Sequence, residues 1–111
     1  IILALVASGM NGQNFCFRGY LPISKHERKK KLHTLENTAI KTGQTQIFIE
    51  TPYRNNQLFE SIIKYCRNET YLCIASNITL PSENIKTRTI YEWKQIKPNF
   101  NKKLIIFLLG A

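Results

Sequence analysis

Hydrophobic positions recur along the chain with two different periods, which predict alternating helices and strands. Within the segment 24–43, apolar residues fall at helical spacing and form one stripe, made of Leu32, Leu35, Ala39 and Ile40. Other segments show short apolar runs or strict alternation, as strands do. In chain order, the patterns predict a helix over 1–9, a strand over 15–17, a helix over 24–43, a strand over 45–50, a helix from Pro52 to Cys66, and strands over 71–75, 86–93 and 103–109.

This order predicts an α/β fold with a mixed β-sheet of about five strands, flanked by helices in two or three layers. The segment 71–75 is continuously apolar, which is typical of a strand buried on both faces. The alternation in 86–93 predicts a strand with one solvated face. Two helix starts carry capping signals: Ser24 and Glu27 match a capping box, and Thr51 precedes a proline at the first helical position.

The composition is that of one folded domain with a strong positive charge. The 111 residues are 43% hydrophobic and 11% aromatic, enough to bury a core. The 16 Lys and Arg against 7 Asp and Glu give a net charge of +9, which favours an anionic partner, most commonly nucleic acid. A basic surface that is merely solvated is the alternative. No apolar run reaches the ~20 residues of a membrane span, so no membrane partner is expected.

The three cysteines, Cys16, Cys66 and Cys73, lie among apolar residues at spacings that fit no zinc site. We expect them to be buried free thiols in a reducing compartment, and the predicted location is cytoplasmic. His26 and His33 share one face of the basic helix and are expected at the surface, so no metal site is predicted. The chain begins on an apolar run without an initiator Met, which favours one domain of a longer protein.

The segment from Glu50 to Arg54 carries the clearest candidate chemistry. It follows a predicted strand and therefore lies at the strand's carboxyl end, where ligands bind in open α/β sheets. Glu50 is the candidate general base, although an ion pair with Arg54 would make it a poor one. The alternative is that the two charges only brace the turn. Asn77 and Thr79 follow the next strand in the same way, as crevice residues or as an Asx-turn. The absence of Asp from the sequence excludes a Ser/His/Asp triad.

A basic segment over 18–33 holds 6 of the 16 Lys and Arg, with Phe17 and Tyr20 interleaved. Aromatic rings among cations are typical of nucleic-acid contacts, which would be strongly salt-dependent. The alternative is a solvated helix face, opposite the apolar stripe, that carries Lys25, Arg28, Lys29, Lys30 and Lys31. Trp93 is expected to pack in the core or at an interface.

Four short strings follow one another along nearly the whole chain. They are Ala7-Ser8-Gly9-Met10, a Phe-x-Phe-x-Gly-Tyr-Leu-Pro stretch over 15–22, Ile49-Glu50-Thr51-Pro52-Tyr53-Arg54, and the strand end over 75–83. A basic helix, 25–31, follows the second string. In this order they resemble the tetrapyrrole methylase superfamily, and most closely its bacterial branch that 2′-O-methylates a cytidine of small-subunit ribosomal RNA.

The resemblance implies that residues 1–111 are the C-terminal domain of a two-domain methyltransferase, with the N-terminal cofactor-binding domain absent from this chain. Members of the family hold S-adenosylmethionine in the cleft between two α/β domains and are usually homodimers. The domain alone would be inactive. Tyr53 and the pair Ser76-Asn77 replace the His and the Arg-Glu of the RNA branch. The implied acceptor is therefore either ribosomal RNA, at a 2′-hydroxyl, or a tetrapyrrole.

The resemblance also assigns site residues. The implied cofactor-binding residues, which would meet its adenosine end, are Ala7, Ser8, Asn77 and Thr79. The implied substrate-binding residues are Arg18, Lys29, Lys30, Lys31, Glu50, Tyr53 and Arg54. The alternative function is a basic nucleic-acid-binding module, or a dimerisation module built on the N-terminal helix and Trp93, without activity of its own.

Overall fold

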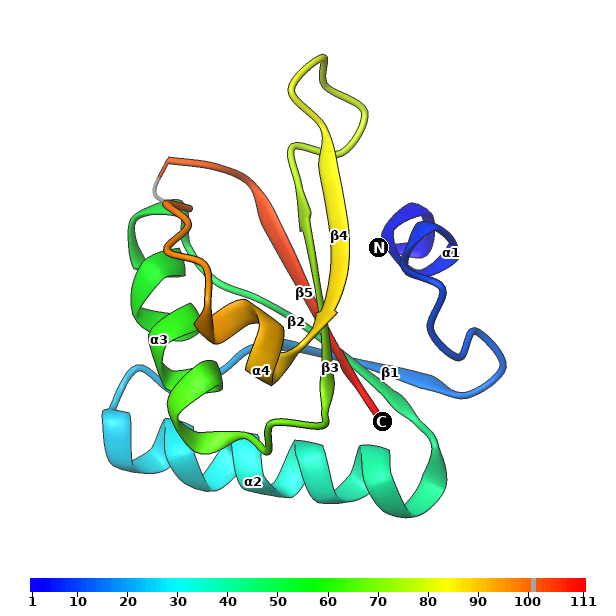
Figure 1. The fold of residues 1–111 in the computed structure, drawn as a ribbon, viewed down its shortest axis with the longest axis vertical. Coiled ribbons are helices and arrows are strands. Elements are labelled where there is room, and N and C mark those ends of the chain that lie inside the picture. Colours follow the sequence, from blue (N-terminus) through cyan, green and yellow to red (C-terminus); the bar gives the residue numbers. More distant parts are fainter. Residues whose placement is uncertain (101) are drawn as a thin grey trace.

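The computed structural model describes residues 1–100 and 102–111, and in them a mixed sheet lies between two layers of helices (Figure 1). The helical elements are α1 (Ile2–Ser8), α2 (Lys25–Thr42), the 3-10 turn η1 (Pro52–Arg54), α3 (Asn55–Tyr65) and α4 (Ile90–Lys94). The strands are β1 (Phe15–Tyr20), β2 (Thr45–Ile49), β3 (Tyr71–Ser76), β4 (Asn84–Thr89) and β5 (Ile105–Gly110). The predicted α/β class with five strands in one mixed sheet is confirmed for the described residues.

The strand order β1-β2-β5-β3-β4 brings three carboxyl ends to one edge of the sheet. β1 and β2 are parallel, and β5 lies antiparallel between β2 and β3, so β2 and β3 also run the same way. Their connections run through α2 and through α3, whereas β4 forms an antiparallel hairpin with β3. The segments that follow β2 and β3, starting at Glu50 and at Asn77, therefore emerge at a common edge, as the sequence predicted.

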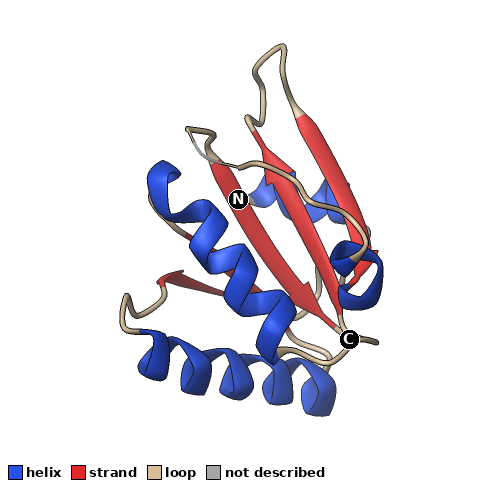
Figure 2. Ribbon diagram, turned by 60° about the vertical axis from the view of Figure 1, so that its left-hand side comes forward, coloured by secondary structure: helices blue, strands red, loops and turns tan. Residues whose placement is uncertain are grey.

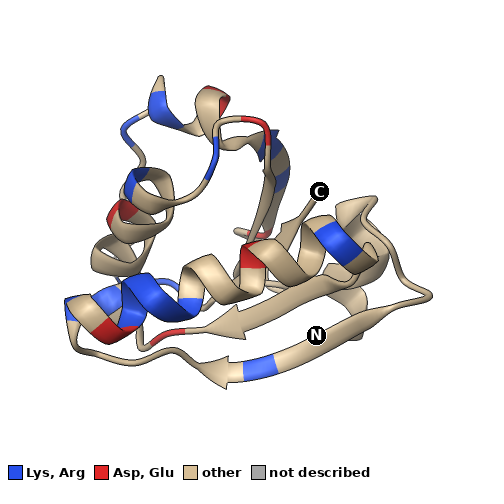
Figure 3. Cartoon of the chain, turned by 90° about the horizontal axis from the view of Figure 1, so that it is seen from below, with Lys and Arg blue, Asp and Glu red and all other residues tan. Residues whose placement is uncertain are grey.

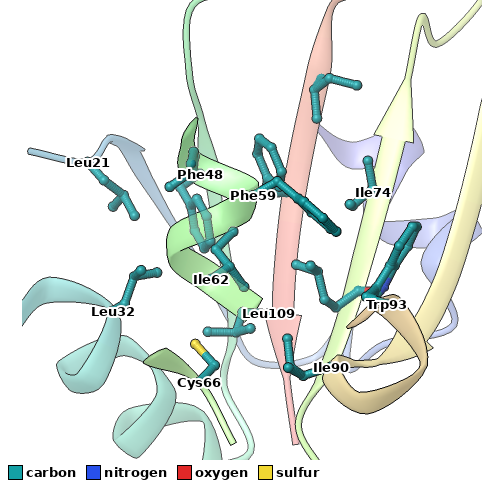
Figure 4. Close-up of a cluster of buried hydrophobic side chains, with 14 of the residues drawn as sticks. Leu21, Leu32, Phe48, Phe59, Ile62, Cys66, Ile74, Ile90, Trp93 and Leu109 are labelled. Carbon is teal, nitrogen blue, oxygen red and sulfur yellow. The ribbon is translucent and has the colours of Figure 1, made fainter. Parts of the chain in front are cut away.

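The main core lies between the sheet and the layer of α2, α3 and α4 (Figure 4). The rings of Phe48 and Phe107 stack at 5.8 Å, and Phe59 meets Trp93 edge-on at the same centroid distance. The indole N–H of Trp93 donates a 2.7 Å hydrogen bond to the Leu72 carbonyl, which satisfies its polar group inside the core. Trp93 is buried, so its predicted packing role is confirmed in the core of this domain.

Among the described residues, α1 is the helix that covers the opposite face of the sheet (Figure 2). Ala4 and Leu5 pack on residues of the central strands. The outward side of the same helix is also apolar, and its exposed side chains are Ile2, Leu3 and Val6. This helix thus has one buried and one solvent-facing hydrophobic side.

The prediction of a strand over 86–93 is wrong beyond Thr89. The alternation is real as far as that residue, but a capping box then starts α4. The Glu92 N–H donates to Thr89 Oγ1 at 3.2 Å, and the Thr89 N–H donates to Glu92 Oε1 at 2.9 Å. The Thr89 N–H and, next, the Thr89 hydroxyl donate to the Glu92 carboxylate and lower its pKa, since they favour its charged form. The capping box therefore ends the strand at Thr89, although the alternation of side chains continues beyond it.

The capping box predicted at Ser24 and Glu27 does not form. Ser24 is the N-cap of α2, but its side chain makes no capping hydrogen bond.

Two positions of α2 also differ from the predicted faces of the helix: Ile40 is 40% exposed, whereas Arg28 is only 2% exposed. Arg28 belongs to the buried side because it points towards Ser61 of α3, to which it is hydrogen-bonded.

All three cysteines are free thiols, as predicted. Cys66 and Cys73 are buried, and burial raises the pKa of both thiols. Cys16 differs from the prediction because it lies on the edge strand β1 and is half-exposed. Across the described residues, no helix is both long and apolar enough to cross a membrane.

Candidate functional site

Two adjoining hollows lie at the edge of the sheet where β1 and β2 end. Their volumes are about 370 and 360 Å³, and both are lined by Tyr20, Glu50 and Thr51. The remaining walls are mainly apolar and include Leu21, Pro22, Ile23, Ile49, Ile78, Leu104, Ile105 and Ile106. We call this region the carboxyl-edge corner. It combines apolar walls with the Glu50 carboxylate, the hydroxyl groups of Tyr20 and Thr51, and the Arg54 guanidinium.

Glu50 is the buried charged group of this corner, with 7% of its surface exposed. Its Oε1 atom accepts a 2.8 Å hydrogen bond from the Thr51 N–H. Its Oε2 atom and Thr51 Oγ1 are buried and have no hydrogen-bond partner among the described residues. Leaving such groups unsatisfied typically costs about 1–3 kcal/mol each. The corner therefore offers two acceptors that a hydroxyl or amine donor of a ligand would satisfy.

Arg54 does not neutralise Glu50. No ion pair joins the two side chains in the part of the chain that the structure describes, so the bracing interpretation is wrong. The Arg54 guanidinium instead lies over the Tyr53 ring, 5.0 Å from its centroid. Tyr53 is 66% exposed, so the cation and the ring together form the outer rim of the corner.

Asn55 and Asn56 stabilise the corner, and the sequence alone predicted no role for either residue. The buried Asn55 side chain donates to the Phe100 and Lys103 carbonyls at 3.2 and 2.8 Å. Asn56 Oδ1 accepts the Phe100 N–H at 2.8 Å. These bonds tie the start of α3 to the loop that enters β5. Thr51 is the predicted N-cap of the turn before α3, but its side chain makes no capping bond.

Asn77 and Thr79 lie at the same edge, but their polar groups shape a turn. Asn77 Oδ1 accepts the Leu104 N–H at 3.1 Å, and its Nδ2 donates to Ser82 Oγ at 3.0 Å. The Thr79 N–H donates to Glu83 Oε1 at 2.8 Å. Both residues have left-handed backbone conformations, with φ of 50° and 70°. Their polar groups therefore stabilise the turn and its link to the segment before β5, but the predicted Asx-turn does not form, because Asn77 Oδ1 accepts from Leu104 and the Thr79 N–H donates to Glu83.

Ala7 and Ser8 lie away from the corner. The Ser8 carbonyl accepts a 2.8 Å hydrogen bond from Thr87 Oγ1, and Thr87 pairs with Cys73 in the sheet. The span along β3 from Cys73 to Asn77 is roughly 13 Å at the usual rise of a strand. Ser8 lines a different hollow, of about 270 Å³, near the opposite ends of the strands. The structure thus divides the four implied cofactor residues between two places.

Arg18 also points away from the corner. Its Nε donates to Gln46 Oε1 at 2.8 Å and its Nη2 to Gln44 Oε1 at 3.3 Å, towards the amino end of β2. The implied lysines differ in exposure: Lys29 and Lys30 are exposed, whereas Lys31 is half-buried. Of the implied substrate residues, only Glu50, Tyr53 and Arg54 meet at the corner.

The described residues contain no group of three His, Cys, Asp or Glu side chains that could hold a metal ion. His26 and His33 are both exposed, as expected. The His33 ring packs edge-on against Tyr65 at 6.4 Å. The candidate chemistry of the corner is therefore that of a carboxylate, two hydroxyl groups, a guanidinium and apolar surface.

No family model matches the chain, but known structures share its fold. The methyltransferase CobJ aligns with 100% of the chain and 47% of its own length, at a TM-score of 0.65 and 17% identity. The uroporphyrin-III C-methyl transferase of Thermus thermophilus, solved with S-adenosyl homocysteine, covers 97% of the chain and 49% of its own, at a TM-score of 0.51 and 14% identity. The chain thus shares its fold with these methyltransferases over about half of their length.

Curated relatives are similar in sequence along almost the entire chain. The ribosomal RNA small subunit methyltransferase I of Haemophilus influenzae is 34% identical over 111 residues, which cover 97% of the chain. The chain spans 38% of the length of that relative.

Proposed function

We propose that the chain is the C-terminal domain of an S-adenosylmethionine-dependent methyltransferase that modifies small-subunit ribosomal RNA at a 2′-hydroxyl. The observation that carries the proposal is the 34% identity, over 97% of the chain, with a relative named ribosomal RNA small subunit methyltransferase I; the 2′-hydroxyl is the acceptor that the sequence resemblance implies. Because the chain spans 38% of that relative, a second, N-terminal domain would complete the site and supply most cofactor contacts.

The carboxyl-edge corner fits the adenosine end of the cofactor. The apolar walls of the larger of its two hollows, which include Ile78, Leu104 and Ile106, suit the flat face of an adenine ring. Thr51 Oγ1 lies buried beside them without a partner among the described residues, and it would accept a hydrogen bond from a ligand hydroxyl or amine group. When bound, S-adenosylmethionine supplies a methyl group that its positively charged sulfur has already activated. The protein then has mainly to align donor and acceptor.

Glu50 is suited to receive the proton of the acceptor hydroxyl. Its Oε2 atom is free of hydrogen bonds among the described residues, and Arg54 does not neutralise the carboxylate. A general base must lie within hydrogen-bonding reach of the proton that it removes. Tyr53 and Arg54 at the rim would then stack on a base and contact a phosphate, respectively.

A tetrapyrrole is the second candidate acceptor. It is favoured by Tyr53 and Ser76-Asn77, which differ from the RNA-modifying branch, and by the mainly apolar walls of the corner. A macrocycle with carboxylate arms would also suit the net charge of +9.

We further propose that the complete protein is a cytoplasmic homodimer. The exposed apolar side of α1, formed by Ile2, Leu3 and Val6, supports a covered surface there. Its cover would be the N-terminal domain or a second copy of the protein.

The test is methyl transfer by the complete protein from labelled S-adenosylmethionine, offered small ribosomal subunits and tetrapyrroles in parallel. We expect label in a 2′-O-methyl nucleotide of the rRNA and none from the isolated 111 residues. Label in the tetrapyrrole alone would select the second acceptor. Absence of transfer to both acceptors would contradict the proposed function.

A further inference from the structure

A hollow of about 640 Å³ lies on the helical side of the molecule, between α2, α3 and α4. Its walls carry four cationic side chains, from Lys25, Arg28, Lys64 and Lys94, against one carboxylate, Glu60. Figure 3 shows the basic residues of α2 gathered over its N-terminal half. We call this region the basic hollow. Its residues come from three helices, so that the positive charge converges only after folding.

Arg28 is the buried member of this set. Its Nε donates to Ser61 Oγ at 2.9 Å, and its Nη1 donates to the Ile23 carbonyl at 3.4 Å. Both partners are neutral, and no carboxylate pairs with Arg28 in the part of the chain that the structure describes. A guanidinium has five N–H donors, so several remain for a ligand in the hollow that it lines. A buried cation without a counter-charge destabilises a fold unless a bound anion neutralises it.

Neighbouring cations strengthen the positive potential instead of balancing it. Lys29 and Lys64, from two different helices, lie over the ring of Tyr65, at 5.2 and 5.5 Å from its centroid. Tyr65 itself lines the hollow. Within residues 1–100 and 102–111 neither lysine forms an ion pair with a carboxylate, so a net positive potential remains around Tyr65 and attracts anions.

We propose that the basic hollow binds the phosphodiester backbone of the RNA substrate, at a docking site distinct from the carboxyl-edge corner. This inference rests on the proposed function. The planar guanidinium of Arg28 matches the geometry of a phosphate, and the exposed lysines at the rim supply positive charges for neighbouring phosphates. The net positive charge of the lining excludes a basic partner and favours a polyanion.

The position of the hollow connects it to the corner. Ile23 contributes its carbonyl to Arg28, and it also lines the smaller hollow of the corner beside Glu50. Along α3, the distance from Arg54 at the corner to Ser61 in the basic hollow is roughly 10 Å at 1.5 Å per residue. An RNA strand that crosses the hollow can therefore reach the corner with a few nucleotides.

The experiment measures RNA binding by the complete protein through fluorescence anisotropy, at several salt concentrations. The probes are a fragment of small-subunit rRNA and an unrelated RNA of equal length. The test variant is Lys25→Gln/Lys64→Gln/Lys94→Gln. The control variant, Lys41→Gln/Lys86→Gln/Lys103→Gln, removes the same charge from exposed positions that do not line the hollow.

We expect the test variant to bind both RNAs about tenfold or more weakly, and the slope of log affinity against log salt to shrink by about two. Backbone contacts predict similar losses for the two sequences. Unchanged affinity and slope in the test variant, or an equal loss in the control variant, would overturn the proposal. So would binding of an acidic protein, but of neither RNA, through the hollow.

The outcomes separate this inference from the proposed function. If the protein methylates rRNA but its RNA affinity does not depend on the lysines of the hollow, the docking site is wrong and the proposed enzyme activity is supported. Salt-dependent RNA binding through the hollow, without any methyl transfer, would support the docking site and contradict the proposed enzyme activity.

Discussion

The carboxyl-edge corner and the basic hollow each bury one charged side chain that forms no ion pair within the described residues. At the corner, this is Glu50, surrounded mainly by apolar walls, with the Tyr20 and Thr51 hydroxyl groups and the Arg54 guanidinium also in the lining. In the basic hollow it is Arg28, held by two neutral acceptors among lysines. An isolated buried carboxylate suits a specific donor, whereas a guanidinium among lysines suits a run of phosphates. The difference points to chemistry at the first region and docking at the second.

The largest effect is expected from Glu50→Gln. Glutamine retains an oxygen for the Thr51 N–H, but it replaces the free carboxylate oxygen with a donor. Methyl transfer by the complete protein should fall roughly 10- to 100-fold, the value of one charged hydrogen bond. RNA affinity should not change. The matched control is Glu69→Gln, at an exposed position outside both regions, which should retain full activity.

Asn55→Ala tests whether the two hydrogen bonds of the Asn55 side chain stabilise the corner. The substitution removes a buried donor from two carbonyls, so we expect the free energy of unfolding to fall by about 1–3 kcal/mol in urea titrations. Asn37→Ala, on an exposed helical position, is the control. A loss of stability equal in both variants would show that the two hydrogen bonds do not fix the corner.

Arg28→Met tests whether Arg28 binds RNA or only stabilises the fold. Because the charge lacks a counter-ion, the free energy of unfolding should stay within about 1 kcal/mol or rise. RNA affinity should nevertheless fall roughly tenfold. Arg18→Met should leave RNA affinity unchanged, because Arg18 is engaged with Gln44 and Gln46. Strong destabilisation by Arg28→Met with normal RNA binding would make Arg28 a structural residue.

The smallest effects concern the starts of α2 and α4, both of which position residues of the hollow. Thr89→Ala should lower the free energy of unfolding by about 1 kcal/mol, because it breaks a formed capping box. Ser24→Ala should change it by only a few tenths, because its side chain makes no capping bond. Equal losses in chemical denaturation would contradict this difference.

Glu92 makes the α4 cap pH-dependent. The lowered pKa of its carboxyl means that the stabilisation is complete above the ordinary glutamate pKa and is lost as the pH falls through the folded-state value. Glu92→Gln should therefore remove part of the acid sensitivity of unfolding. An unchanged acid profile in this variant would assign that sensitivity to other carboxylates.

The sequence predicts the fold well where one period dominates. The stripe that includes Leu32 and Leu35 placed α2, and the apolar run of 71–75 placed β3. It failed at Thr89, where a local cap competes with an alternating pattern that continues past it. Periodicity cannot reveal that competition, because both patterns use the same residues.

The corner was predictable and the hollow was not, for a physical reason. Glu50, Tyr53 and Arg54 lie within one turn of chain, so local spacing brings them together. Arg28 and Lys94 meet only through tertiary packing. One signal was available: Arg28 precedes Leu32 by four and Leu35 by seven, the spacing of the buried stripe. A charged residue at such a position is a reason to look for a ligand.

The most direct test of the two-region division is the steady-state kinetics of methyl transfer to a small-subunit rRNA fragment by the complete protein. We expect Glu50→Gln to lower kcat while the KM for RNA stays the same. The variant Lys25→Gln/Lys64→Gln/Lys94→Gln should raise the KM for RNA and leave kcat unchanged. A change of the same kinetic parameter in both variants, or an unchanged kcat in Glu50→Gln, would contradict the division into a chemical corner and a docking hollow.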